Sequence, residues 1–411
     1  MWFTLSRRKY LLEKCSLAQI KKRACFILTE ILRIYPMSAN PRPRVLLLIP
    51  HLGGGGAERV TALLASGLSK EKYEMHLGLI TQTNLDITLP ASVHVHCLGA
   101  RRVRASVFRL LRLVRQLKPE LILSGMAHLN FLVLLLRPFF PRGTHVLVRQ
   151  NGTISATLAF GGVPWYTRLL YRLLYRLADR VICQTESMAA DLALELGVPE
   201  NRLAVLPNPV DVGEIRTFSG LNSAPQTGSR SGPGPHLLAV GRLAPEKGFD
   251  LLLRALVSVR REFPQASLLI AGAGPQEAAL KAECHALELD SAVRFAGRID
   301  RPWTLFPAAT LFVLPSRHEG LPNALLEAAA AGLPIVALPA SGGVVDLLRD
   351  QSGVWLASTL SEDALAASLL AALRVLRPSE RFAHRFVEAF RIDRAIQAYE
   401  RLIDRILAVG Q

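Results

Sequence analysis

Short apolar runs alternate with longer segments of helical periodicity along most of the chain, and this alternation restricts the fold more than any other feature. It begins at Arg44, stops in a stretch rich in Gly, Ser, Pro, Gln and Thr at residues 219–235, and resumes at His236. Such a pattern is typical of βαβ units, in which crossover helices join parallel strands. Because 411 residues suffice for two full hydrophobic cores, we predict an α/β protein with two doubly wound, Rossmann-like domains facing a central cleft.

The expected elements fall into two series. In the first we expect strands at residues 45–50, 75–80, 121–124, 145–149, 181–184 and 203–206, and helices at 57–69, 105–117, 164–178 and 187–196. In the second we expect strands at residues 237–240, 267–271, 293–296, 311–314 and 334–337, and helices at 249–263, 276–287 and 323–331. The predicted parts are an N-terminal extension (1–43), a first domain (44–212), a linker (213–235), a second domain (236–379) and a C-terminal helix (380–411).

The positive charge is concentrated in one half of the chain. Residues 1–212 hold 28 Lys and Arg against 13 Asp and Glu, whereas residues 213–411 hold 21 against 20, so their formal charges are +15 and +1. A basic half can meet nucleic acid, anionic lipid or an acidic substrate. No zinc-finger spacing and no aromatic-rich RNA-binding signature is present. We therefore expect an anionic membrane surface as a partner, and no nucleic acid.

Two predicted helices carry much of this charge. One is surrounded by basic side chains: Arg101, Arg102, Arg104, Arg109, Arg112, Arg115 and Lys118. The other has a basic stripe at every fourth position, with aromatic residues interleaved: Arg168, Arg172 and Arg176, with Trp165, Tyr171 and Tyr175. Such helices suit a lipid headgroup layer, where each basic residue contributes about 1 kcal/mol. An ordinary solvated helix face is the alternative.

The N-terminal residues and the cysteines bear on location. Apolar residues recur at helical spacing through residues 20–34 with Lys and Arg between them, which fits a basic amphipathic helix on a membrane surface. The alternative is that translation starts at Met37. The five cysteines are dispersed and include no CxxC pair, which is typical of reduced, cytosolic thiols. With no run of about 18 apolar residues, we expect a peripheral protein on the cytoplasmic face of the plasma membrane.

The strongest functional signal is a pair of glutamates in the run 316–327, SRHEGLPNALLE. Glu319 lies in a turn after an apolar strand, and Glu327 lies in the second turn of the helix that opens at Pro322. The first turn of a helix offers unpaired backbone N–H groups and a partial positive charge. Two carboxylates that accept hydroxyls, beside a helix end that attracts anions, suit a ligand that is half sugar and half phosphate. A nucleotide sugar fits that description.

Other predicted strand ends in the second half carry glycines and cations. Gly241-Arg242-Leu243 and Glu246-Lys247-Gly248 follow one strand, where two cations could stabilise a leaving diphosphate. The alternative is a surface turn with an ion pair between Glu246 and Lys247. Gly272 and Gly274 end the next strand and allow close backbone approach, and Gly297-Arg298 ends the one after it. All lie at the edge where such folds bind ligands.

A glycine-rich loop follows the first strand, in the run 51–60, HLGGGGAERV. Without side chains, Gly55, Gly56 and their neighbours can lie flat against phosphate, and the helix N-terminus that follows adds positive potential. A dinucleotide fingerprint is the competing interpretation. The loop does not give GxGxxG in frame, and no acidic residue ends the second strand near Ile80.

Together, GRL–EKG, GAGP, FAGR and SRHEGLPNALLEAAAAGLPIV resemble the donor half of the family 4 glycosyltransferases. The resemblance to this family covers the chain from about Arg44 to the C-terminus. The resemblance implies a GT-B fold and a retaining, metal-independent enzyme without cofactor. It assigns Arg242 and Lys247 to the donor diphosphate, Glu327 to the ribose and Glu319 to the transferred sugar, with backbone N–H groups of Gly320 and Leu321 nearby. It also implies that residues 44–212 bind the acceptor, that residues 236–379 bind the donor, and that the C-terminal helix packs back on the first domain.

The catalytic group of the acceptor domain is less constrained. His128 follows the strand at 121–124, but the family register can also be drawn with Met126 there. Arg149 and Asn151, at the end of the next strand, are alternatives that could point into the same cleft. Asn208 matches a family turn near the hinge, where Asn and Pro build the turn.

We therefore expect a transferase that moves a hexose or N-acetylhexosamine from a nucleotide donor, with a UDP-sugar favoured. Because the basic half is the acceptor half, the expected acceptor is a lipid-linked saccharide or a lipopolysaccharide-type glycan. Two rivals remain: a nucleotide-sugar epimerase of similar fold, and a non-catalytic nucleotide-sugar binding protein at the membrane.

Overall fold

The computed structural model describes residues 42–53, 55–81, 89–159, 164, 166–219, 234–340, 343–377 and 379–409. The predicted N-terminal amphipathic helix, Trp165 and most of the predicted linker lie outside these residues. Two units are distinguished, Met1–Pro43 and Arg44–Gln411, and the second contains both sheets. Within the described ranges, every helix is too short or too polar to cross a lipid bilayer.

The first sheet is parallel and has seven strands in the order β3-β2-β1-β4-β5-β6-β7. The strands are β1 (Arg44–Ile49), β2 (Glu74–Leu79), β3 (His94–Cys97), β4 (Leu121–Gly125), β5 (His145–Arg149), β6 (Arg180–Cys183) and β7 (Leu203–Val205). Its helices are α2 (Gly56–Gly67), α3 (Val107–Leu117), α4 (Ala127–Leu136), α5 (Ile154–Ala159), α6 (Thr167–Leu174) and α7 (Glu186–Leu196). The strand order reverses between β1 and β4, as in a Rossmann fold.

The second sheet is also parallel and has six strands in the order β10-β9-β8-β11-β12-β13. They are β8 (His236–Val240), β9 (Ser267–Ala271), β10 (Val293–Gly297), β11 (Leu311–Leu314), β12 (Ile335–Ala337) and β13 (Val354–Leu356). Its helices are α9 (Phe249–Glu262), α10 (Glu277–Ala286), α11 (Asn323–Ala330), α12 (Val344–Leu348) and α13 (Glu362–Val375), with the 3₁₀ helices η5 (Pro245–Lys247) and η6 (Pro302–Ala308). The order reverses between β8 and β11. Two doubly wound Rossmann-like sheets, as predicted, are therefore present.

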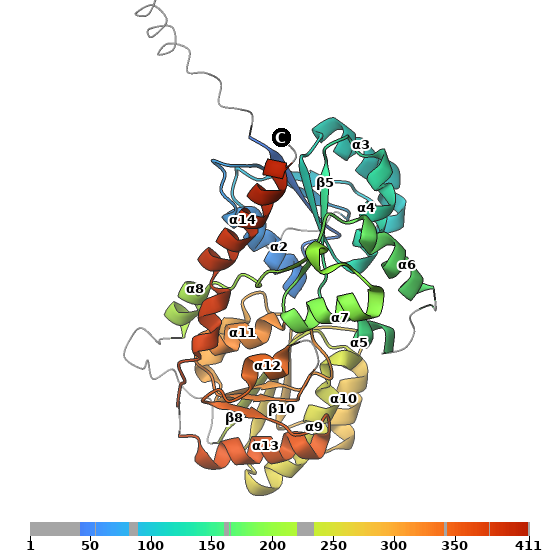
Figure 1. Cartoon of the computed structure of the whole chain (residues 1–411). Helices are drawn as coiled ribbons and strands as arrows, with labels where there is room; N and C mark the ends of the chain where they lie inside the picture. Colours follow the sequence, from blue (N-terminus) through green and yellow to red (C-terminus); the bar gives the residue numbers. More distant parts are fainter. Residues whose placement is uncertain are drawn as a thin grey trace, which may run out of the picture. The chain divides into compact units, whose positions relative to one another are not determined.

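The apolar strand sequences follow from burial on both faces. In β1, Leu46 and Leu48 pack in the core beneath α3 and α4, whereas Val45, Leu47 and Ile49 pack in the core beneath α2 and the last helix, α14 (Ile392–Val409). Figure 1 shows α3, α4 and α6 on one side of this sheet and α2 with α14 on the other. A parallel sheet covered by helices on both faces has no polar face, so its strands are continuously apolar.

Helix α14 is bound to the first sheet by polar contacts as well. Lys72 donates to the carboxylates of Glu400 and Asp404 at 3.1 Å each, and the backbone N–H of Ser69 donates to Glu400 at 2.8 Å. The Tyr73 hydroxyl donates to Asp404. Since α14 follows the second sheet in the chain, these contacts join the C-terminal residues to the first half.

Several elements were not predicted. Strand β3 has an exposed, polar sequence (His-Val-His-Cys) and gives no apolar signal. Helix α4 is apolar on all sides, so it shows no amphipathic period. The predicted linker was wrong at its start, because residues 212–218 form α8 (Val212–Phe218), which is capped by Asp211 and buries Val212 and Ile215 beside α11. The predicted helix at 164–178 ends in a 3₁₀ turn, η3 (Tyr175–Leu177).

Two glycines with left-handed backbones provide a test of this packing. Gly248 has φ 64°, and a Cβ atom there would lie 2.0 Å from the carbonyl oxygen of Pro315, in the loop after β11. Gly297 has φ 67°, and a Cβ atom there would meet nothing within 4 Å. We expect Gly297→Ala to lower the unfolding free energy by about 1–2 kcal/mol, the cost of a left-handed alanine. Gly248→Ala should cost at least about 2 kcal/mol more, since the two loops must separate.

Urea denaturation of both variants, followed by circular dichroism, measures this difference. Equal losses in the two variants would contradict the described contact between the residue 248 turn and the loop after β11.

Candidate functional site

Two loops of the second sheet meet at its switch point. The guanidinium of Arg317, in the loop after β11, donates to both carboxylate oxygens of Asp250 at 2.7 and 2.5 Å. Its backbone N–H donates to the carbonyl of Glu246 at 2.9 Å, in the turn after β8. Gly248 allows this close approach. The two motif-bearing loops therefore lie side by side at the carboxyl ends of β8 and β11, where doubly wound folds bind ligands.

Lys247 and Glu319, predicted to serve a diphosphate and a sugar, are in direct contact. The Lys247 ammonium donates to both carboxylate oxygens of Glu319 at 2.6 and 2.8 Å, and the Ser316 hydroxyl donates to the same carboxylate at 2.7 Å. Glu319 is 8% exposed. A charged lysine and a hydroxyl thus hold a buried carboxylate in one orientation at this edge of the sheet.

Arg242 adds a second cation to this edge. Its guanidinium donates to Glu246 at 2.5 Å, and its side chain is largely exposed. The alternative interpretation had paired Glu246 with Lys247, and that was wrong: Glu246 pairs with Arg242, while Lys247 pairs with Glu319. Arg298, at the end of β10, contacts Asp300 at 3.2 Å.

The glycines of these loops serve backbone packing. A Cβ atom at Gly272, whose φ is 155°, would lie 1.8 Å from the carbonyl oxygen of Gly241, and one at Gly274 would lie 2.3 Å from that of Leu243. A Cβ atom at Gly320 would lie 2.5 Å from the carbonyl oxygen of Asn151, in the first half of the chain. The glycines thus allow backbone contact between the loops after β8 and β9, and between the loop after β11 and the loop after β5. Leu321, beside Gly320, is buried and packs against α11.

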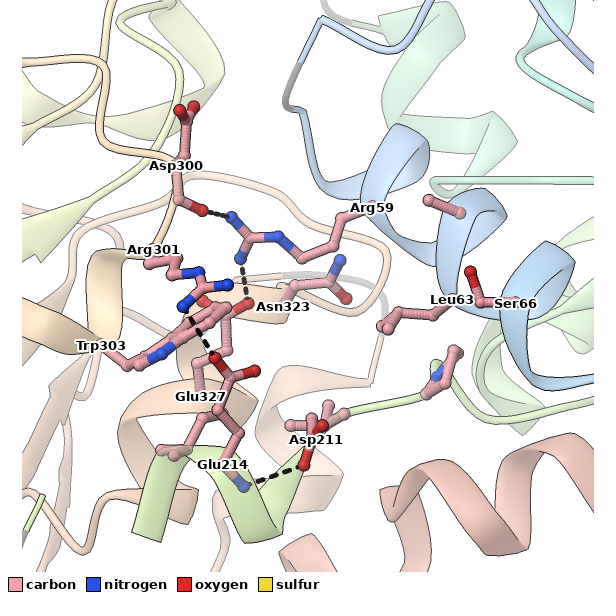
Figure 2. A pocket seen from close by; sticks show the side chains of 14 residues that line it. Arg59, Leu63, Ser66, Asp211, Glu214, Asp300, Arg301, Trp303, Asn323 and Glu327 are labelled. Atoms are coloured by element: carbon pink, nitrogen blue, oxygen red, sulfur yellow. Dashed lines mark hydrogen bonds and ion pairs between the residues drawn. The ribbon is translucent and has the colours of Figure 1, made fainter. Parts of the chain in front are cut away.

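Glu327 lies elsewhere, in the wall of a cavity of about 300 Å³. Figure 2 shows its lining, which comes from α2, α11, the residues around η6 and the segment leading into α8: Arg59, Ala62, Leu63, Ser66, Pro209, Val210, Asp211, Glu214, Ile215, Asp300, Arg301, Trp303, Asn323 and Glu327. Lys247, Arg242 and Glu319 are not among these residues. The two glutamates of the motif therefore have different surroundings.

Glu327 is paired with an arginine of the first half. Nη1 of Arg59 donates to Oε1 of Glu327 at 2.6 Å, and the carboxylate is only 5% exposed. Burial raises the pKa of Glu327, and the charge and hydrogen bond of Arg59 oppose that rise. Arg59 also donates to the backbone carbonyl of Asp300, and its guanidinium lies 4.9 Å from the centre of the Trp303 ring (Figure 2).

The glycine-rich loop leads into the same region. Gly55 caps α2, and a Cβ atom there would lie 2.3 Å from Oε2 of the buried Glu58. The carbonyl of Gly56 accepts a hydrogen bond from Nδ2 of Asn323 at 2.9 Å, so the start of α2 is fixed against the start of α11. His51 lies 3.5 Å from Glu58.

His128 lies in the first turn of α4 and is exposed. The surrounding protein and the proximity of His51 lower its pKa. The residue before α4, Met126, has a positive φ of 83°, which is costly for a non-glycine residue and is characteristic of functional sites.

Arg149 and Asn208 form a buried network. The Arg149 guanidinium donates to the side-chain oxygens of Asn151, at 2.5 Å, and Asn208. Asn208 in turn donates to Oδ1 of Asn323 at 2.7 Å and to the carbonyl of Leu321 at 3.3 Å. Arg149 is therefore committed to joining β5 to the hinge turn, and Asn208 joins the two halves.

Sequence reasoning assigned no role to Arg59, Trp303 or Asn323. Arg59 lies within the quoted glycine-rich run, and its charge in the first turn of α2 is the one local signal that could have drawn attention to it. Its partner Glu327 is 268 residues away in the sequence. Among the described residues, no group of three or more His, Cys, Asp or Glu side chains is arranged to hold a metal ion.

The Asn208 network predicts a stability difference between two asparagines that accept from the same arginine. Asn208→Ala should lower the unfolding free energy by about 2–3 kcal/mol, because it removes the acceptor of Nη2 of the buried Arg149 guanidinium and the hydrogen bonds of Asn208 to Asn323 and Leu321. Asn151→Ala should cost less than about 1 kcal/mol, since Asn151 is exposed and water can replace it. Urea denaturation of both variants tests this. Equal losses of unfolding free energy would contradict the larger structural role given to Asn208.

Known families and structures can be compared with this geometry. Residues 225–389 match the family described as Glycosyl transferases group 1, and residues 54–214 match Glycosyltransferase Family 4. An uncharacterized glycosyltransferase of Haemophilus influenzae is 25% identical, over 76% of this chain and 85% of its own length. A Campylobacter jejuni enzyme, N-acetylgalactosamine-N,N'-diacetylbacillosaminyl-diphospho-undecaprenol 4-alpha-N-acetylgalactosaminyltransferase, is 24% identical, over 79% of this chain and 88% of its own length.

Among solved structures, Anabaena Alr3699/HepE in complex with UDP and glucose superposes with a TM-score of 0.70 at 17% identity, covering 88% of this chain and all of the other. At that identity the likeness shows the fold alone. One family match covers most of each half of the chain, and each half contains a doubly wound parallel sheet, as predicted. The chain therefore belongs to the family 4 glycosyltransferases and has the GT-B fold.

Proposed function

We propose that this glycosyltransferase transfers a hexose or N-acetylhexosamine from a nucleotide sugar, with UDP-sugar favoured, to a lipid-linked saccharide or lipopolysaccharide-type acceptor, with retention of the anomeric configuration. The observation that carries the proposal is the group formed by Lys247, Glu319 and Ser316 at the second switch point. This group places an ammonium and a fixed carboxylate beside the N-terminus of α11. Those are the elements that a sugar diphosphate requires.

Each side chain has a task in this reaction. Lys247 and the nearby Arg242 would hold the donor diphosphate and stabilise the negative charge that develops on it as the sugar–phosphate bond breaks. Glu319 would accept hydrogen bonds from hydroxyls of the transferred sugar, while Glu327 would accept from the ribose. Because these cations and the helix N-terminus already supply positive charge, the proposal does not require a divalent metal ion.

The proposal that the anomeric configuration is retained rests on the contacts that the two carboxylates make. Double displacement needs a free carboxylate nucleophile at the anomeric carbon. Glu319 is bound by Lys247 and Ser316, and Glu327 by Arg59. We therefore propose departure and attack on the same face of the sugar, with the acceptor entering from the side of the first sheet. His128, at the end of β4, is the proposed group that receives the acceptor proton, since its lowered pKa keeps it neutral near pH 7.

A lipid-linked acceptor is supported by a relative and by the surface of the first half. The Campylobacter relative is named for a diphospho-undecaprenol substrate. On α6 and η3, arginine and leucine repeat as adjacent pairs every four residues, and all six side chains are exposed: Arg168, Leu169, Arg172, Leu173, Arg176 and Leu177. Two more apolar side chains nearby are exposed: Leu135 at the end of α4 and Phe139 in η2 (Arg137–Phe139). Arg137 of η2 donates a hydrogen bond to Asp179, just after η3, and so links the two segments.

These residues make a basic and apolar surface, which we call the α4–α6 surface. Exposed leucines in this number are unusual on a protein that is surrounded by water alone. Apolar side chains that enter the acyl boundary, beside arginines that contact phosphate headgroups, fit an anionic membrane. Helix α4 carries His128, the proposed proton acceptor, in its first turn and ends at this surface. A lipid-anchored acceptor could thus reach the site from the cytoplasmic face of the membrane.

Sugar transfer tests the reaction. With isotope-labelled UDP-, GDP- and ADP-sugars and a bacterial lipid extract, one donor should label lipid. Lys247→Ala should reduce that transfer by 100-fold or more, a loss of about 3 kcal/mol of transition-state stabilisation. Lys281→Ala is the matched control, because Lys281 also pairs with a glutamate but lies on α10. Turnover of the donor without labelled lipid would favour the nucleotide-sugar epimerase. Binding of the donor without any turnover would favour the non-catalytic binding protein.

Vesicle sedimentation tests the α4–α6 surface. The protein should bind vesicles containing 30 mol% phosphatidylglycerol in phosphatidylcholine, a composition of roughly the charge of a bacterial inner leaflet. Leu169→Gln with Leu173→Gln should weaken binding by roughly tenfold, from the loss of two inserted leucines. Leu360→Gln, an exposed leucine of the second half, is the control. Unchanged binding in the double variant would exclude this surface as the membrane contact.

A further inference from the structure

The family motifs assign no role to the contact between Arg59 and Glu327, and the proposed chemistry uses it only to argue that Glu327 is not a free nucleophile. Arg59 extends from the first turn of α2, directly after the glycine-rich loop, into the donor-binding half (Figure 2). It contacts three groups on two segments of that half: the carboxylate of Glu327 on α11, and the carbonyl of Asp300 and the ring of Trp303 around η6. No other described basic side chain of the first half pairs with a carboxylate of residues 234–377.

We propose that Arg59 is a positioning residue for the donor: it holds the ribose-binding carboxylate of Glu327 from the opposite half, so that the ribose subsite is complete only when the two halves are in contact. The proposal rests on the proposed function, in which Glu327 accepts hydrogen bonds from the ribose.

The geometry supports this role. Arg59 binds one carboxylate oxygen, Oε1, through one nitrogen, Nη1. A carboxylate has two oxygens and about four acceptor positions, so a bound Glu327 can still accept from two vicinal hydroxyls. The second nitrogen, Nη2, is directed to Asp300, and the guanidinium plane lies against Trp303, so its orientation is fixed on both sides. Arg59 therefore orients Glu327 without occupying it completely.

The charge of Arg59 is needed because Glu327 is buried. A buried carboxylate without a cation becomes protonated instead of remaining charged, and then donates where it should accept. Burial raises the pKa of Glu327, and Arg59 is the cation that opposes this rise. Asn323 fixes the start of α11 to Gly56, and Asn208 fixes it to the hinge turn, so α2 and α11 are held at the separation that this ion pair requires.

The test is titration calorimetry with UDP, GDP and ADP as probes, followed by transfer kinetics with the donor that binds. Arg59→Gln should weaken binding of the nucleoside diphosphate by roughly 10- to 100-fold, the range for loss of a charge-assisted hydrogen bond. It should raise the donor KM by a similar factor and change kcat little. Arg59→Lys, which keeps the charge but lacks the planar fork, should recover part of the affinity.

Two further readouts separate positioning from general disruption. First, the loss should be absent with the 2′,3′-dideoxy form of the same nucleotide, which has no hydroxyls for Glu327. Second, the affinity of Arg59→Gln should improve as the pH is raised, because without Arg59 the pKa of Glu327 is higher and the carboxylate forms only at higher pH. In the wild type the same transition should lie at lower pH.

Arg374→Gln is the matched control. Arg374, on α13, also pairs with a glutamate, Glu262 of α9 at 2.6 Å, but does not line the cavity. It should leave nucleotide binding within twofold of the wild type. Thermal melting of each variant shows that it is folded.

The outcomes separate this inference from the function on which it rests. If none of the three nucleotides binds the wild type, the donor assignment fails and the inference fails with it. If one binds the wild type and binds Arg59→Gln equally well, only the inference fails. Tighter binding to Arg59→Gln would overturn it in favour of the opposite role, an arginine that competes with the ribose.

Discussion

Burial of both faces of two parallel sheets is the constraint on which the rest of the structure depends. In β1, alternate residues enter two different cores, one shared with α3 and α4 and the other with α2 and α14. A polar side chain buried within such a strand costs free energy unless it finds a partner, so polar chemistry concentrates at the strand ends. The glycine-rich loop, the Lys247 turn and the loop of Glu319 all occupy carboxyl ends at the points where strand order reverses.

The loops at these ends are held by backbone contact. Gly248, Gly272, Gly274 and Gly320 each lie where a Cβ atom would overlap a neighbouring carbonyl group. Because the loops approach so closely, Lys247 of one loop reaches Glu319 of the next, which Ser316 also contacts from within its own loop. The loops of Lys247 and Glu319 are therefore held against each other. Glu327 is contacted from the first half, through Arg59 of α2.

Contacts between the halves concentrate on α11. Its first residue, Asn323, bonds to Gly56 and Asn208, and its second turn carries Glu327, which bonds to Arg59. One short helix thus presents an N-terminus suited to phosphate and a carboxylate suited to hydroxyls, and is contacted by the first half at both places. A change in the separation of the halves would therefore alter the surroundings of both the N-terminus of α11 and Glu327.

The sequence by itself determined the alternation of strands and helices, the two parallel sheets, the strand ends that carry Lys247 and Glu319, and the helix that carries Glu327. Those features depend on local periodicity, turn chemistry and the rule that strand ends share an edge. It missed β3 and α4, because a polar edge strand and a helix that is apolar all round lack the expected period. Only the tertiary structure decided which charges pair. Lys247 has Glu246 beside it in sequence, yet it bonds to Glu319, and Glu327 bonds to an arginine 268 residues away. Such choices depend on the relative placement of whole elements, which no local pattern records.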